Sequence, residues 1–167
     1  EVEPNTQVPA GQLYYQPGPA PDRIVLSPAA DAASGFAVSW RTDDNVSAPW
    51  LELAVLGDSP AFAATRRVQA SSHRLDTETG RAHFHHARID GLQADTTYLY
   101  RVQGNGRWSS WNRFTTAAAA DAPLTLLYFG DTQNKNLSHV TRVVRQAMRQ
   151  APQARLALFA GDLVSGG

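Results

Sequence analysis

Short runs in which apolar and polar residues alternate follow one another from Asp22 to Thr116, and no helical period competes with them. In "GFAVSWRT" (35–42), Phe36, Val38 and Trp40 share one face and the residues between them share the other. Further strand-like runs are "RIVLS" (23–27), "APWLELAVLGD" (48–58), with Leu51, Leu53 and Val55 on one face, "HFHHARIDGL" (83–92), "TTYLYRVQGNG" (96–106) and "RWSSWNRFTT" (107–116). Short strands separated by turns every ~8 to 12 residues are typical of a β-sandwich. The sequence therefore predicts a mainly β fold.

Two local signals support the sandwich. The Gly104–Asn105–Gly106 turn favours a tight hairpin, because Asn-Gly tolerates the positive φ angles that such turns need. Tyr98 follows Leu92 at the spacing of a tyrosine corner, in which the phenol hydroxyl bonds back to the chain near a sandwich edge. With Trp40 on an early strand, these features resemble a fibronectin type III or related immunoglobulin-like module.

The pattern changes on both sides of the sandwich. Residues 1–21 are rich in Pro, Gly and Gln and are expected to run extended, while "AAAADAP" (117–123) is expected to be a linker. Beyond the linker we predict a strand at 124–129, a helix at 137–151 capped by Asn136 or Ser138 and ended by Pro152, and a strand at 155–160. This order is one β-α-β unit, which builds a parallel sheet.

Both strands of this unit end in Gly-Asp, in "LTLLYFGDTQ" (124–133) and "RLALFAGDLV" (155–164). Asp131 and Asp162 are therefore expected at the carboxyl edge of the sheet, where α/β proteins bind ligands. Neighbouring strands lie about 4.8 Å apart, so the two carboxylates can converge, and bound cations would relieve their repulsion. Gly-Asp is also a common turn dipeptide, but two copies at matching strand ends favour a site. A phosphate-binding glycine loop is an unfavourable alternative, because "GDTQNKN" lacks the closely spaced glycines.

Here the sequence resembles a known family. "FGDTQ" and "FAGDLVSGG" resemble the first two motifs of calcineurin-like metallophosphoesterases, and residues 22–116 resemble the amino-terminal domain of purple acid phosphatases. The resemblance implies that 124–167 begins a catalytic domain with two divalent or trivalent metal ions of iron, manganese or zinc. It implies that Asp131 ligates the first metal, that Asp162 bridges both, and that a metal-bound hydroxide attacks a phosphate ester, with no catalytic side chain beyond the ligands.

The chain departs from the family pattern at several positions. Gln133 stands where many relatives carry a histidine ligand; its amide oxygen is either a weaker ligand or part of a plain loop. Ser165 stands where the purple enzymes place a tyrosine, so no charge-transfer colour is expected. His139 is a candidate for substrate binding, against the alternative of a solvated helix face. The family's third motif, Gly-Asn-His, is absent, so we expect this chain to be the inactive front portion of a longer enzyme.

Composition narrows the classes of partner and compartment. Fifteen basic residues balance fifteen acidic ones, which argues against nucleic-acid binding. There are no cysteines, and no apolar run approaches the ~20 residues of a membrane span. The chain begins with Glu1 and a Pro- and Gly-rich segment, so we expect a secreted or periplasmic protein whose signal peptide has been removed. A shortened expression product is the alternative, and the oligomeric state is not indicated.

A binding or adhesion module that recognises a glycan or a protein is the second functional hypothesis. Trp50, Trp108 and Trp111 could form a sugar platform, but Trp108 and Trp111 have opposite parity, so packing is favoured. His83 and His85 have a spacing that can hold a metal on one face of a strand, although that face must be polar in any case.

Overall fold

The computed structural model describes residues 16–58, 64–77 and 79–163 of the 167-residue chain. These residues divide into two compact units, and the division falls between Asp121 and Ala122. Each unit is described by itself below.

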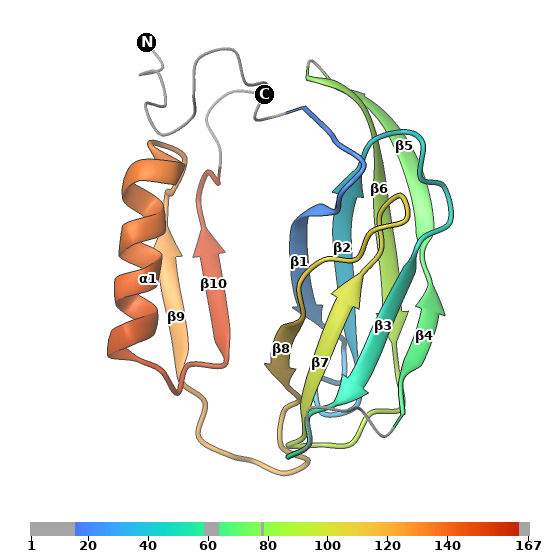
Figure 1. The fold of residues 1–167 in the computed structure, drawn as a ribbon. Coiled ribbons are helices and arrows are strands. Elements are labelled where there is room, and N and C mark those ends of the chain that lie inside the picture. Colours follow the sequence, from blue (N-terminus) through green and yellow to red (C-terminus); the bar gives the residue numbers. More distant parts are fainter. Residues whose placement is uncertain (1–15, 59–63, 78, 164–167) are drawn as a thin grey trace. The chain divides into compact units, whose positions relative to one another are not determined.

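The first unit is a pair of antiparallel four-stranded sheets, coloured blue to yellow in Figure 1. One sheet has the order β1 (Asp22–Pro28), β2 (Phe36–Thr42), β6 (Gly80–Ile89) and β5 (Ser71–Thr77). The other has the order β4 (Arg66–Gln69), β3 (Trp50–Val55), β7 (Thr97–Val102) and β8 (Asn112–Thr115). The prediction of a mainly β, sandwich-like fold is confirmed.

The core of this unit lies between the inner faces of the two sheets. Phe36, Val38 and Trp40 of β2 are each at most 1% exposed, as their alternation predicted. The cluster is completed by residues of β3, β6 and β7 and of the connection at Ala70, namely Leu51, Leu53, Ala70, Ala87, Ile89, Tyr98, Tyr100 and Val102. Val55 does not join them: it ends β3 and is 53% exposed, because no strand residue covers it there.

Strands β4 and β5 were not anticipated from the sequence. Each is an edge strand of its sheet, and most of its residues are exposed; on β4 only Val68 packs against the core. An edge strand that buries so little has little reason to alternate apolar and polar residues, so its sequence carries almost no signal. Ala70 separates the two strands and donates its backbone N–H to the carbonyl of Pro49, so the chain passes from one sheet to the other there.

The predicted tyrosine corner and hairpin are both present. The phenol oxygen of Tyr98 accepts a hydrogen bond from the backbone N–H of Gln93 at 3.0 Å. β7 and β8 pair antiparallel, and the turn between them is closed by the N–H of Gly104 on the carbonyl of Arg107 at 2.7 Å. Gly106, with φ +65°, supplies the left-handed residue of that turn.

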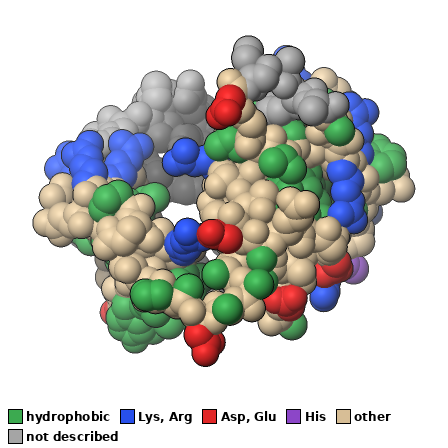
Figure 2. Space-filling view, turned by 90° about the horizontal axis from the view of Figure 1, so that it is seen from below, with side chains coloured by type: hydrophobic (Ala, Val, Ile, Leu, Met, Phe, Trp, Pro, Cys, Tyr) green, Lys and Arg blue, Asp and Glu red, His purple; other side chains and the backbone are tan. Residues whose placement is uncertain are grey.

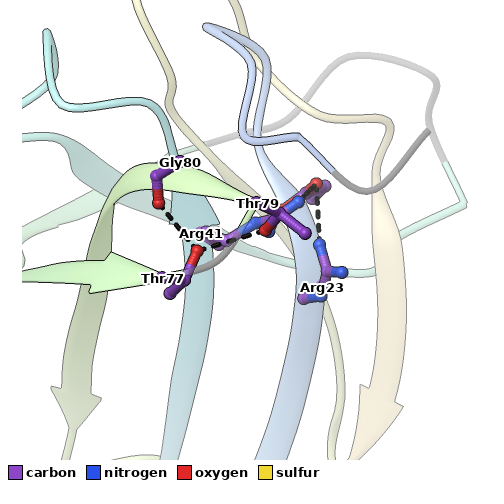
Figure 3. A network of polar contacts seen from close by, with 6 residues as sticks. Arg23, Arg41, Thr77, Thr79 and Gly80 are labelled. Atoms are coloured by element: carbon purple, nitrogen blue, oxygen red, sulfur yellow. Dashed lines mark hydrogen bonds and ion pairs between the residues drawn. The ribbon is translucent and has the colours of Figure 1, made fainter. Parts of the chain in front are cut away.

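A polar contact fastens the first strand to its neighbour. Arg41 of β2 is 3% exposed. Its Nε donates to Oδ1 of Asp22 in β1 at 2.8 Å, and its Nη2 donates to Oδ2 of the same carboxylate at 2.6 Å. Figure 3 shows Arg41 beside the β5–β6 turn, where the Thr77 hydroxyl donates to the carbonyl of Gly80 at 2.7 Å. A bidentate arginine–carboxylate pair fixes both partners in one geometry, which holds the start of β1 in register.

The second unit is a β-α-β arrangement. β9 (Leu126–Gly130) and β10 (Leu156–Ala160) are parallel and in register, from Leu126 opposite Leu156 to Gly130 opposite Ala160. Between them lie a π-helical turn (Asn136–Val140) and helix α1 (Thr141–Gln150), which ends just before Pro152.

The predicted helical stretch is present, but its first turn is of another kind. A π-helical turn (Asn136–Val140) comes first, and the α-helix follows from Thr141. The predicted cap is wrong, because neither Asn136 nor Ser138 caps the helix through its side chain. Lys135, in the left-handed conformation with φ +52°, precedes the π-helical turn instead. The Asn136 side chain instead donates a hydrogen bond to the carbonyl of Leu163.

The two faces of the β9–β10 pair are covered unequally. Phe129 and Phe159 stack at 5.0 Å between ring centroids, and Val144 and Met148 of α1 line an apolar groove with Phe129. On the other face the apolar side chains stay open to solvent, with Leu126, Tyr128 and Leu158 exposed by 45%, 65% and 49%. Within the described ranges, no helix is both long and apolar enough to cross a bilayer.

Candidate metal site at the strand ends

The backbone at Asp131 leaves β9 in an unusual conformation. Asp131 is left-handed, with φ +45°, and its N–H donates to the carbonyl of Ala160 in β10 at 2.8 Å. Aspartate is one of the few residues besides glycine that adopts this conformation, because its short polar side chain can hydrogen-bond locally. Asp131 is thus held against the end of the neighbouring strand with its carboxylate exposed.

The second motif lies directly against the first. Gly161 has φ +86°, and a Cβ atom there would come within 3.1 Å of the backbone nitrogen of Asp131 and 3.3 Å of its Cα. Glycine is therefore required at 161 on two grounds, conformation and space. Gly130 differs, because a Cβ there would meet nothing closer than 4.0 Å. Asp162 follows Gly161 immediately and is also exposed. The structure thus brings the two Gly-Asp motifs side by side.

Gln133 reaches back to the first aspartate. Its Nε2 donates to Oδ1 of Asp131 at 3.1 Å, so the amide lies beside the carboxylate that the sequence singled out. In this orientation the amide nitrogen, not the oxygen, faces the carboxylate. A cation on Asp131 would require the amide to turn over and present Oε1, since an NH₂ group cannot coordinate a cation.

His139 is not brought to the aspartates by any contact in the described structure. It lies in the π-helical turn, is exposed, and its Nδ1 is 2.9 Å from the hydroxyl of Ser138. The turn, the start of α1 and the ends of β9 and β10 are all at one end of this unit (Figure 1). His139 therefore lies at the same end of the unit as the two strand ends, but it makes no described contact with either aspartate.

The donor chemistry of this edge suits a hard cation. Two carboxylates and an amide supply oxygen ligands, which magnesium, manganese and calcium prefer, whereas zinc and iron are usually also bound by imidazole. In the described part of the chain, no group of three or more histidine, aspartate, cysteine or glutamate side chains is positioned to hold a metal.

Asn136, a candidate helix cap in the sequence, connects the two loops that follow the strands. Its Nδ2 donates to the carbonyl of Leu163 at 3.0 Å, so it joins the loop after β9 to the loop after β10. Its Oδ1 is buried and, among the described residues, has no hydrogen-bond partner. The sequence held no signal for this contact, because it connects two loops that are far apart along the chain.

The histidines of β6 have structural partners. His85 is 1% exposed, and its two ring nitrogens lie 2.8 Å from the hydroxyls of Thr42 and Ser72. Nδ1 of His83 lies 2.6 Å from the carbonyl of Val46. These ring nitrogens are within hydrogen-bond distance of protein oxygens. The described structure therefore favours histidines that form part of a polar strand face over histidines that bind a metal.

Burial makes His85 a source of acid sensitivity. Burial, and secondarily the charge of His83, lowers the pKa of His85 from 6.5 to about 4. The unfolded chain then binds this proton more readily than the folded one. The free energy of unfolding should therefore fall as the pH drops from about 6.5 towards 4, by up to about 3 kcal/mol.

Urea unfolding at pH 7 and at pH 4 tests this prediction. His85→Gln should flatten the dependence on pH relative to the natural chain, whereas His73→Gln, an exposed histidine on β5, should leave it unchanged. If the free energy of unfolding of His85→Gln depends on pH as strongly as that of the natural chain, His85 is not the source of the acid sensitivity.

A buried carboxylate on the β4–β3–β7–β8 sheet binds two arginines, and these arginines contact the rings of Trp108 and Trp111. Glu52 is 2% exposed and accepts hydrogen bonds from Nε of Arg67 at 2.9 Å and Nε of Arg101 at 2.6 Å. Burial alone would raise the pKa of Glu52, but the hydrogen bonds and charges of the two arginines outweigh it and lower the pKa. The guanidinium carbon of Arg101 lies 4.7 Å from the ring centroid of Trp108 and 4.5 Å from that of Trp111.

The parity prediction for Trp108 and Trp111 is therefore wrong. Both rings contact one guanidinium, because the residues between them lie outside β8, which begins at Asn112, and do not alternate as a strand would. Each ring carries an arginine on a face that a sugar would need for stacking. The rings thus pack against arginine side chains, and it is these contacts, not the parity of the two residues, that argue against a sugar platform.

The described structure defines an antiparallel β-sandwich protein with a short β-α-β unit. Residues 21–116 match the family model described as "Purple acid Phosphatase, N-terminal domain". This match covers more than half of the chain, and the chain belongs to that family.

Two proteins of Arabidopsis thaliana are similar over a longer stretch. "Fe(3+)-Zn(2+) purple acid phosphatase 12" is 26% identical over 155 residues, covering 88% of this chain and 31% of that protein. "Purple acid phosphatase 5" is 28% identical over 150 residues, covering 86% of this chain and 36% of that protein. This chain thus spans about a third of the length of these relatives. Since residues 1–116 make up only about seven tenths of the chain, both similarities must extend past Thr116.

Among solved structures, the sensor domain of the anti-sigma factor RsgI4 in Pseudobacteroides cellulosolvens is similar with a TM-score of 0.38 and 18% identity. The similarity covers 58% of this chain and 97% of that domain. A score this low supports no conclusion about function.

Proposed function

We propose that this chain belongs to a metal-dependent phosphohydrolase of the purple-acid-phosphatase type, which cleaves phosphomonoesters or phosphodiesters at a dinuclear metal centre. One observation carries the proposal: the backbone of Gly161 lies against that of Asp131, at the ends of two adjacent parallel strands that are each followed by an aspartate. Membership of the family and the two similar phosphatases support the same class.

Each residue of the site has a proposed part. Asp131 would help to hold one metal ion, and Asp162 would help to hold both. Gln133 adds an amide oxygen once its side chain turns over, and His139 contacts the substrate. A metal pair bound here would activate water and neutralise charge on the phosphoryl oxygens. The protein's own contribution is to hold the carboxylates close together, with the Asp131 N–H fixed on Ala160.

We further propose that residues 124–167 begin a catalytic domain whose remaining ligands lie in a longer polypeptide, with residues 22–116 as its amino-terminal domain. The relatives are about three times as long as this chain, and the open apolar face at Leu126, Tyr128 and Leu158 is what further elements of a sheet would cover. On this proposal the 167-residue chain is inactive by itself. Secretion or export to the periplasm is part of the same proposal.

The test is a metal-dependence assay on the protein expressed from its full reading frame. Dialysis against a chelator should abolish hydrolysis of para-nitrophenyl phosphate, and manganese, iron or zinc should restore it, because the metals supply the activated water. The 167-residue chain serves as the inactive control. Hydrolysis that persists unchanged in the metal-free protein would overturn the proposal.

A further inference from the structure

The loop after β9 and the loop after β10 are joined by one side chain. Asn136 begins the π-helical turn, and its backbone carbonyl accepts hydrogen bonds from the N–H and the hydroxyl of Thr141, the latter at 2.9 Å. The turn therefore fixes the backbone from which the Asn136 side chain extends. From this fixed base, Nδ2 donates to the carbonyl of Leu163, the residue after Asp162, at 3.0 Å.

The other end of the same amide is unexplained by the described structure. Oδ1 of Asn136 is buried without a hydrogen-bond partner among the described residues. A buried acceptor left unpaired is unfavourable, so it calls for an explanation such as a water or an ion.

We infer that Asn136 is a positioning residue, which ties the Asp162 loop to the Asp131 loop and so holds the two carboxylates ready for shared cations. This inference rests on the proposed function for its metal. Three contacts then define the junction: Asp131 N–H on the Ala160 carbonyl, Gly161 against the Asp131 backbone, and Asn136 on the Leu163 carbonyl. The first two contacts involve backbone atoms. The contact of Asn136 is made by a side chain, so a substitution can remove it.

The inference has a metal-free readout. In the isotope-labelled 167-residue chain, the Asp131 amide should be protected from hydrogen exchange by its bond to Ala160. Asn136→Ala should speed this exchange by about tenfold or more, since the two loops would separate more often. Asn136→Asp keeps the size but cannot donate to the Leu163 carbonyl, so it should behave in the same way. Asn134→Ala, an exposed position in the same loop, is the matched control and should leave the exchange rate unchanged.

The second readout is the affinity for Mn²⁺, followed in the same samples by paramagnetic broadening of the Thr132 and Gly161 amide signals. Residues that orient metal ligands typically contribute 10- to 100-fold to affinity. Asn136→Ala should therefore weaken Mn²⁺ binding by about tenfold, with the sandwich signals unchanged, and Asp162→Asn should abolish the localised broadening.

The outcomes separate the two proposals. Natural exchange rates and natural Mn²⁺ affinity in Asn136→Ala would overturn the role of Asn136 and leave the phosphohydrolase proposal standing. Faster exchange together with natural affinity would reduce Asn136 to a structural residue and likewise overturn the inference. If the natural chain shows no broadening near Asp131 at millimolar Mn²⁺, the positioning role is rejected, whereas the phosphohydrolase proposal is decided separately by the metal-dependence assay on the protein expressed from its full reading frame.

Discussion

Asp162→Asn is expected to lower the rate of phosphate-ester hydrolysis by at least about a hundredfold in the protein expressed from its full reading frame. Changes to residues that merely orient metal ligands already cost 10- to 100-fold, and Asp162 is proposed to bind metal directly. Asparagine keeps the shape of the side chain but loses its negative charge. The cations would then repel each other with less compensation, and metal content should fall together with rate.

The matched control for this variant is Asp121→Asn. Asp121 is an exposed aspartate at the end of the sandwich unit and belongs to neither Gly-Asp motif, so its change should leave the rate within twofold of the natural protein. Rate and bound metal should be measured on the same preparations, with circular dichroism to verify folding. An Asp162 variant that keeps the natural rate would reject the assignment of this aspartate.

Trp40→Ala is expected to lower the free energy of unfolding of the sandwich by about 3–5 kcal/mol, which is the usual cost of deleting a buried tryptophan side chain. Trp40 is 1% exposed and lies in the core between the sheets. Its Nε1 donates to the carbonyl of Gln103 at 3.0 Å, a contact between β2 and the end of β7 that the variant also loses. Urea unfolding of the 167-residue chain, followed by far-ultraviolet circular dichroism, measures the loss.

Trp50→Ala is the control for the size of the change. Trp50 lies on β3 but is 38% exposed, so its removal should cost about 1 kcal/mol or less. If Trp40→Ala proves too unstable to fold, Trp40→Phe retains most of the buried area and should show an intermediate loss. Equal stability of the two alanine variants would mean that the core does not centre on Trp40.

Where burial follows a local period, the fold could be predicted from the sequence. Phe36, Val38 and Trp40 alternate because one face of β2 is packed and the other is not. The parallel pairing of β9 with β10 follows from the strand–helix–strand order, since a crossover helix returns the chain in the same direction. Edge strands β4 and β5 carry no such pattern, because most of their residues are exposed.

The candidate site could be predicted only in part. The residue types at 131, 133 and 162 marked a cation site, but Asn136 gave no sign of its part, since a helix cap explained it equally well. The error about Trp108 and Trp111 arose from the opposite cause. A strand period was applied to residues outside any strand, where the backbone turns both rings towards Arg101.

By itself the sequence determined most of the strands and the helix, most of the apolar core positions, and the carboxylates that follow β9 and β10. These properties are local, because each depends on the period of one element or on the residue type at its end. Only the tertiary structure decided that Gly161 lies against Asp131 and that Asn136 reaches Leu163. Such contacts join loops far apart in the chain, and they arise from the register of two parallel strands and from left-handed backbone at Asp131 and Gly161, which no local pattern encodes.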